Sequence, residues 1–169
     1  NVGKGFGIPV ILRYILEFCR DSPSAIEVLK RIPTHMSYNS TLVDAQQRFA
    51  TVYITPDKAP VVRQVPVATN HQESVEWLSH ARFTATVERE RFLLQRLTLH
   101  RDPLEKFIGA FLRPPLYSTA FKAGFGTLYT AVYRPLLQQM EVRWPGTVWT
   151  LDMGNFQEGG RRVQFPGAA

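Results

Sequence analysis

The order of helical and extended patterns along the sequence predicts an α+β fold in a single domain. Two helical patterns come first, three extended segments follow, and two further helical patterns precede two final extended segments. The composition agrees with this class, because 44% hydrophobic and 20% charged residues are typical of a globular chain. With 169 residues, the chain is long enough to bury roughly 70% of its unfolded surface in one core.

The first helices are marked by proline and by capping residues. A helix is predicted over Pro9–Cys19, since proline is favoured in a first helical turn. The polar stretch that starts at Asp21 interrupts this helix and supplies N-caps for a second one over Ser24–Arg31. Pro33 ends the second helix, because the residue before a proline avoids the helical conformation.

A strand-rich block follows. Residues 37–44 and 48–56 are predicted to form a β-hairpin, and residues 59–70 a third extended segment. Pro60 and Pro66 indicate that parts of this segment lie at a sheet edge or at an irregularity, since proline cannot donate to a central ladder.

The second half repeats this order. Helices are predicted over Ala81–Leu99 and Pro103–Leu112, and a second β-hairpin over residues 126–135 and 138–144. The tail from Pro145 is rich in glycine and aromatic residues, and we expect it to pack irregularly.

The charge and the hydropathy of the sequence limit the kinds of partner that we expect. Twenty Lys and Arg against fourteen Asp and Glu give a formal net charge of +6, but the basic residues are scattered and residues 86–99 alternate in sign. This pattern argues against a nucleic-acid partner. No apolar run approaches the ~20 residues of a membrane-spanning helix. We therefore expect a cytoplasmic protein without a membrane partner.

The single cysteine, Cys19, excludes an internal disulfide and fits a reducing compartment. It continues the helical spacing of Ile11 and Ile15, so we expect a buried structural thiol rather than a nucleophile.

No cofactor or metal site is predicted. The glycines near the N-terminus do not follow a strand and lack the Gly-Lys-Ser/Thr sequence of a phosphate-binding loop. No nucleophile-elbow serine motif is present. The histidines do not have the spacing of metal ligands; they are His35, His71, His80 and His100.

The stretch "VATNHQ" ends the third extended segment with Thr69, Asn70 and His71. Two interpretations stay open on these residues alone. Asn and His suit a turn after a strand, where Asn can satisfy the backbone. An amide NH2 at a strand end is also a good hydrogen-bond donor to a developing oxyanion.

The ordered segments "GFGIPVILRYILEFC", "SAIEVLKRIP", "SYNSTLVDA", "ITPD" and "ATNH", followed by "TLYTAVYRP" and "MEVRWPG", resemble one family. It is the acyl-CoA:6-aminopenicillanate acyltransferase-like family of N-terminal-nucleophile hydrolases, related to choloylglycine hydrolases and penicillin V acylases. The resemblance covers nearly all of residues 5–146. It implies a four-layer αββα sandwich, of which residues 1–169 are the C-terminal portion of a single domain.

The resemblance also implies a chemistry. Such enzymes cleave themselves before a cysteine, whose thiolate then attacks an amide or acyl substrate while its α-amine acts as the base. By this resemblance Asn70 stabilises the oxyanion, and Thr69 and His71 support the turn. Thr86 and Arg89 fit a Ser/Thr-x-x-Arg pattern that follows the Thr-Asn-His motif in the family. A salt bridge and a substrate-binding or structural-core role both stay open for Arg89.

The sequence departs from the family pattern at two positions, and these departures determine where we expect the nucleophile. Cys19 lies on a helix rather than at the position of the nucleophile, and Gly124 stands near the place of a family arginine. We therefore expect the nucleophilic cysteine on a segment upstream of residue 1 or on a companion chain, and the isolated chain to be inactive.

The alternative is a non-catalytic binding or scaffold protein with the same fold. The expected ligand is a small amide or acyl compound. Its identity, the choice between hydrolysis and acyl transfer, and a homo-oligomeric state are left open.

Overall fold

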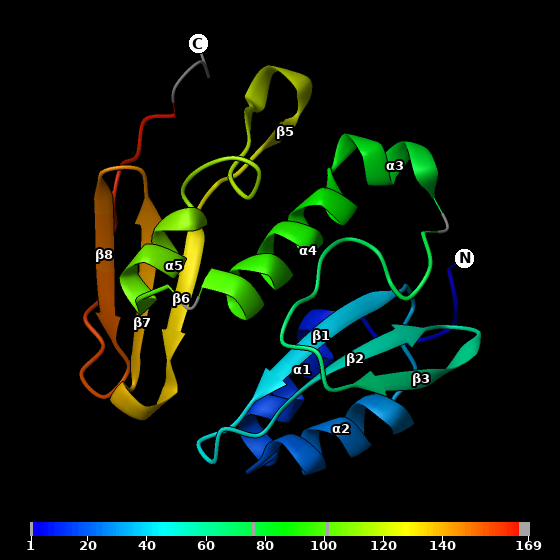
Figure 1. The fold of residues 1–169 in the computed structure, drawn as a ribbon. Helices are drawn as coiled ribbons and strands as arrows, with labels where there is room; N and C mark the ends of the chain where they lie inside the picture. Colours follow the sequence, from blue (N-terminus) through cyan, green and yellow to red (C-terminus); the bar gives the residue numbers. More distant parts are fainter. Residues whose placement is uncertain (1, 76, 101, 166–169) are drawn as a thin grey trace. The chain divides into compact units, whose positions relative to one another are not determined.

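The computed structural model describes residues 2–75, 77–100 and 102–165, and it shows a mixed α+β fold with antiparallel sheets (Figure 1). The chain divides into two compact units, residues 1–90 and 91–169. The prediction that all residues form one domain stays a prediction.

The first unit is built on a three-stranded antiparallel sheet with β2 in the centre, and two helices lie on one of its faces (Figure 1). A third, short helix follows the sheet. The elements are α1 (Ile8–Phe18), α2 (Ser22–Arg31), β1 (Tyr38–Val43), β2 (Phe49–Thr55), β3 (Lys58–Arg63) and α3 (Leu78–Phe83).

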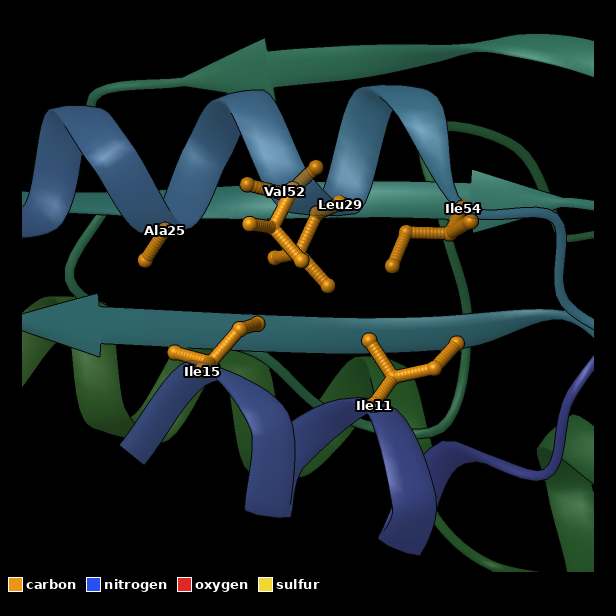
Figure 2. Packing of buried hydrophobic residues seen from close by; sticks show 7 residues of the cluster. Ile11, Ile15, Ala25, Leu29, Val52 and Ile54 are labelled. Atoms are coloured by element: carbon orange, nitrogen blue, oxygen red, sulfur yellow. The ribbon is translucent and has the colours of Figure 1, made fainter. Parts of the chain in front are cut away.

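The core of this unit lies between the two helices and the central strand. Figure 2 shows side chains of α1 and α2 pointing toward Val52 and Ile54 of β2. Ile11 and Ile15 are four residues apart on α1, and so share one helix face. Val52 and Ile54 are two residues apart on a strand, and so share one face of the sheet. The buried cluster comprises Ile11, Ile15, Ala25, Val28, Leu29, Val52 and Ile54.

Asp44 joins the β1–β2 turn to the start of α2. Its carboxylate accepts hydrogen bonds from the backbone N–H of Ser22 at 3.1 Å, from the backbone N–H of Arg48 at 3.0 Å and from Arg48 Nε at 2.8 Å. Burial raises the pKa of Asp44, but these hydrogen bonds and the Arg48 charge outweigh it and lower the pKa to about 2.

Most predicted elements of this unit are confirmed, with shifted ends. The third extended segment is shorter than predicted, because pairing with β2 ends at Arg63 and residues 64–70 leave the ladder. Pro60 lies on β3, an edge strand of this sheet, as the proline pattern indicates.

The predicted continuous helix over Ala81–Leu99 is wrong. The chain forms α3, then α4 (Thr86–Gln95), then a π-helical turn over Arg96–His100. The interruption lies at Ala85, whose φ of 48° is left-handed. Thr84 closes α3, because both its N–H and its hydroxyl donate to the carbonyl of His80.

The second unit holds α5 (Leu104–Ala110) and a sheet of order β6-β7-β8 (Figure 1). Its strands are β6 (Thr130–Arg134), β7 (Gln139–Trp144) and β8 (Thr147–Asp152), and a minor hairpin pairs β4 (Thr119–Ala120) with β5 (Phe125–Gly126).

The expectation of an irregular tail from Pro145 is wrong for residues 147–152, because β8 pairs with β7 along its whole length. Gly146, with φ of 77°, provides the left-handed residue of the tight turn between the two strands. Residues 166–169 of that tail lie outside the described residues.

Within the part of the chain that the structure describes, no helix is both long and apolar enough to cross a membrane.

Truncation of the core is expected to destabilise the first unit. Leu29 is 1% exposed, so Leu29→Ala should lower the free energy of unfolding by roughly 2–5 kcal/mol through lost burial and a cavity. Urea denaturation measures this loss. Leu16→Ala is the matched control, since Leu16 is 84% exposed and its truncation should cost less than about 0.5 kcal/mol.

Acid is expected to weaken the Asp44 junction. Because the folded-state pKa of about 2 lies below the ordinary 3.8, the carboxylate favours folding above that value and loses this contribution as pH falls toward 2. Asp44→Asn should therefore lower the unfolding temperature at neutral pH and flatten its decline between about pH 5 and 2. Thermal unfolding at several pH values measures both effects, with Glu27→Gln on α2 as the control. A decline as steep as in the wild type would contradict this account.

Candidate functional site

A cavity of about 560 Å³ lies in the first unit, at the end of the segment that leaves β3. Its walls come from residues 36–39, from residues 69–72 and from the described residues around the start of α3. The predicted site residues Thr69, Asn70 and His71 all line this cavity. Arg89 does not line it, and instead contacts Asn70 from α4.

Polar side chains of the sheet hold the segment that carries these residues. The Asn39 carboxamide donates to the backbone carbonyls of Thr69 and His71, each at 2.7 Å. The Thr51 hydroxyl donates to the carbonyl of Val65 at 2.7 Å. Asn39 pairs with Tyr53, and Thr51 and Tyr53 alternate along β2 with Val52 of the core cluster. One face of the sheet is therefore apolar core, and the opposite face binds the site segment.

The first turn of α4 holds the segment from its other side. Thr86, Arg89 and Glu90 are spaced by three and four residues, and so lie on one helix face. The Thr86 hydroxyl accepts from the backbone N–H of Asn70 at 2.7 Å. Glu90 Oε2 lies 3.2 Å from His71 Nε2. One helical turn thus contacts both Asn70 and His71.

The contact with Arg89 fixes how the Asn70 carboxamide is turned. Nη2 of Arg89 donates to Oδ1 of Asn70, and its Nε donates to the carbonyl of Thr84 at 2.9 Å. A guanidinium has five donors and no acceptor, so the atom that faces it is the amide oxygen. Among the described residues, none accepts a hydrogen bond from Nδ2 of Asn70, which leaves both amide hydrogens for a ligand. Burial lowers the pKa of Arg89, because the charged guanidinium loses part of its solvation.

His71 is enclosed by hydrogen-bond partners. Its Nδ1 lies 2.9 Å from Thr86 Oγ1 and 3.2 Å from Thr69 Oγ1. Because a carboxylate only accepts, the neutral His71 imidazole that donates to Glu90 carries its proton on Nε2, and its Nδ1 is then an acceptor for a hydroxyl. These are contacts of a residue that supports the turn, and they also join an imidazole to two hydroxyl groups.

Sequence reasoning missed two residues of this arrangement, Asn39 and Glu90. Asn39 could have been identified as a carboxamide on a predicted strand, on the face opposite the apolar side chains. A signal for Glu90 is its spacing of four residues from Thr86, which places a carboxylate beside a hydroxyl on one helix face. Neither signal says what the side chain contacts, because both partners lie in the distant segment 69–71.

The other residues singled out from the sequence lie elsewhere. Cys19 directly follows α1, is half-buried against the core cluster and does not line the cavity. Gly124 belongs to the second unit, where its φ of 73° closes a 3₁₀ turn.

The histidines whose side chains are described do not gather into a metal centre. In residues 2–75, 77–100 and 102–165, no group of three or more His, Cys, Asp or Glu is placed to hold a metal ion. His80 lines the cavity and its ring lies 5.4 Å from that of Trp77, whereas His35 lies beside Tyr38. The side chain of His100 lies outside what the structure describes.

The chain combines an α+β fold with a side-chain amide that is held beside a cavity. Comparison with known families assigns it more closely. Residues 1–149 match the family described as acyl-coenzyme A:6-aminopenicillanic acid acyl-transferase, and the chain belongs to this family. The resemblance found in the sequence is thereby confirmed. The family is N-terminal-nucleophile-hydrolase-like, and its membership indicates acyltransferase or amidase activity. No curated protein and no solved structure matched the chain.

The Asn39 contacts are expected to determine how firmly the site segment is held. Asn39→Asp keeps the shape but replaces the NH2 donor with a carboxylate oxygen that faces two carbonyls. The free energy of unfolding should fall by roughly 1–3 kcal/mol through these lost hydrogen bonds, and urea denaturation measures it. Asn155→Asp introduces the same charge at an exposed position and should leave stability nearly unchanged. Equal effects of the two substitutions would show that the Asn39 donors contribute nothing.

Proposed function

We propose that this protein catalyses acyl transfer from, or hydrolysis of, a small amide or acyl thioester, with Nδ2 of Asn70 as an oxyanion donor. The observation that supports the proposal is the Arg89–Asn70 contact, since it leaves a fixed NH2 group beside the cavity. The oxygen of a carbonyl under nucleophilic attack becomes negative, and a donor already held in place stabilises it without reorganisation.

The proposed nucleophile is a cysteine at a free N-terminus, produced by self-cleavage and carried by a segment or companion chain outside residues 1–169. Its thiolate attacks the acyl carbon, and its α-amine, with an ordinary pKa near 8, takes up the thiol proton. The acyl group then passes to water or to an amine. Cys19 is a poor candidate, because it packs against the core cluster and does not line the cavity.

The four-layer αββα sandwich and the single domain belong to the same proposal. In the first unit, helices cover one face of the sheet and the site segment crosses the other. A cytoplasmic location and the upstream partner segment also remain proposals.

Asn70→Ala is expected to slow the chemical step. In the protein that carries the cysteine nucleophile, kcat should fall by roughly 10²–10³-fold with little change in KM, because the donor acts on charge that develops in the transition state. Steady-state kinetics with a series of neutral N-acyl amides and acyl-CoA thioesters measures both constants. Asn155→Ala, an exposed carboxamide in the second unit, is the matched control.

The result also separates the proposed enzyme from a non-catalytic binding protein. Normal turnover in the Asn70→Ala variant would remove Asn70 from the mechanism. Failure of the cysteine-bearing protein to release or transfer an acyl group from any of these substrates would favour the binding protein.

A further inference from the structure

Thr69, His71 and Glu90 form a hydroxyl–imidazole–carboxylate series beside the cavity. Thr69 Oγ1 lies 3.2 Å from His71 Nδ1, and His71 Nε2 lies 3.2 Å from Glu90 Oε2. A hydroxyl within hydrogen-bond reach of a base, with a third group orienting that base, is the arrangement that activates an oxygen nucleophile. The cysteine reaction proposed above does not use it.

The hydrogens of this network can be assigned along one direction. The Asn70 backbone N–H donates to Thr86 Oγ1 at 2.7 Å, and the Thr86 hydroxyl donates to Thr69 Oγ1 at 2.8 Å. The Thr69 hydroxyl then donates to Nδ1 of His71, which is the acceptor because Nε2–H faces Glu90. Each hydroxyl donates once and accepts once. The hydroxyl that donates to Nδ1 of His71 is therefore that of Thr69.

Access also selects Thr69. Thr86 Oγ1 lies near the same nitrogen, at 2.9 Å, but Thr86 is 0% exposed and does not line the cavity. Thr69 is half-buried and lines the cavity together with Asn70. Thr69 and Asn70 thus both border the space that an acyl donor in the cavity would occupy.

We propose that Thr69 is a second, cysteine-independent nucleophile that accepts an acyl group from activated esters and thioesters. Its Oγ1 attacks the acyl carbonyl carbon, and His71 Nδ1 takes the hydroxyl proton. The bond from that carbon to the leaving oxygen or sulfur then breaks, and the proton on His71 passes to the leaving group.

A water molecule completes the cycle. It attacks the acyl–Thr69 ester and gives a proton to His71 Nδ1, and the Thr69 oxygen leaves and takes that proton back. No oxidant, metal or cofactor enters the balance. Glu90 is a positioning residue, since it contacts the imidazole and not the substrate.

The test uses the purified protein with all cysteine thiols, Cys19 included, alkylated by iodoacetamide, so that a thiol cannot accept the acyl group. Addition of 4-nitrophenyl acetate should release a burst of one equivalent of nitrophenolate. Peptide mapping by mass spectrometry should find one acetyl group, on Thr69. The same alkylation abolishes the cysteine reaction, so failure of one proposal is distinguishable from failure of the other.

Matched variants identify the participants. Thr69→Val keeps the shape without the hydroxyl and should abolish the burst, whereas Thr69→Ser should retain it. His71→Gln should lower the acylation rate by roughly 10²-fold or more, as expected for loss of a general base. Glu90→Gln should lower it by a smaller factor, and Glu90→Asp should restore part of the loss. Thr150→Val removes an exposed hydroxyl on β8 that does not line the cavity, and should change nothing.

Unfolding temperatures of the variants separate a loss of chemistry from a loss of folding. Thr69→Ser and Glu90→Asp keep the hydroxyl and the carboxylate, so they test the chemistry with the functional groups in place. Acetyl on another residue, or a burst of wild-type size in Thr69→Val, would overturn the proposal. An unchanged acylation rate in His71→Gln would overturn it as well.

Discussion

A guanidinium group only donates hydrogen bonds, and the candidate site depends on this constraint. Arg89 forces the oxygen of the Asn70 carboxamide toward α4 and leaves the NH2 group without a protein partner among the described residues. Thr86, three residues earlier on the same helix, binds the Asn70 backbone. Two residues of one helical turn therefore set both the position and the orientation of the Asn70 amide. This arrangement requires α4 to begin at Thr86. The left-handed Ala85 sets that beginning.

The sheet also supports the site segment, and its two faces have different roles. Val52 and Ile54 face the helices, whereas Asn39 and Thr51 use their polar groups to bind a chain segment without regular structure. Each such bond contributes about 1 kcal/mol net, but a partner left buried and unpaired costs more. A satisfied polar face thus specifies one position for residues 65–71, where an apolar face would allow several.

The sequence predicted the parts of this arrangement that local patterns encode. The first two helices and the β1–β2 hairpin follow from periodicity and from proline. The sequence pattern places Asn70 at the end of the third extended segment, but β3 already ends at Arg63. The break at Ala85 does not, because one left-handed residue leaves the spacing of apolar side chains on either side unchanged. β8 was not predicted, because it lies in a tail that is rich in glycine. The His71–Glu90 contact joins residues nineteen positions apart through the packing of α4, and no local pattern reports it.

The two proposed nucleophiles differ in the base that they require. Only the threonine requires the imidazole that the hydrogen-bond network around His71 holds in place. An oxyanion donor such as Asn70 serves whichever atom attacks, because the charge develops on the substrate. A cysteine at a free N-terminus brings its own amine, so an imidazole is not required there. A threonine hydroxyl is a far weaker nucleophile and does require one. An imidazole held between a carboxylate and a hydroxyl at the cavity is what an oxygen nucleophile requires, and the hydrogen bonds that orient it also anchor the backbone of Asn70.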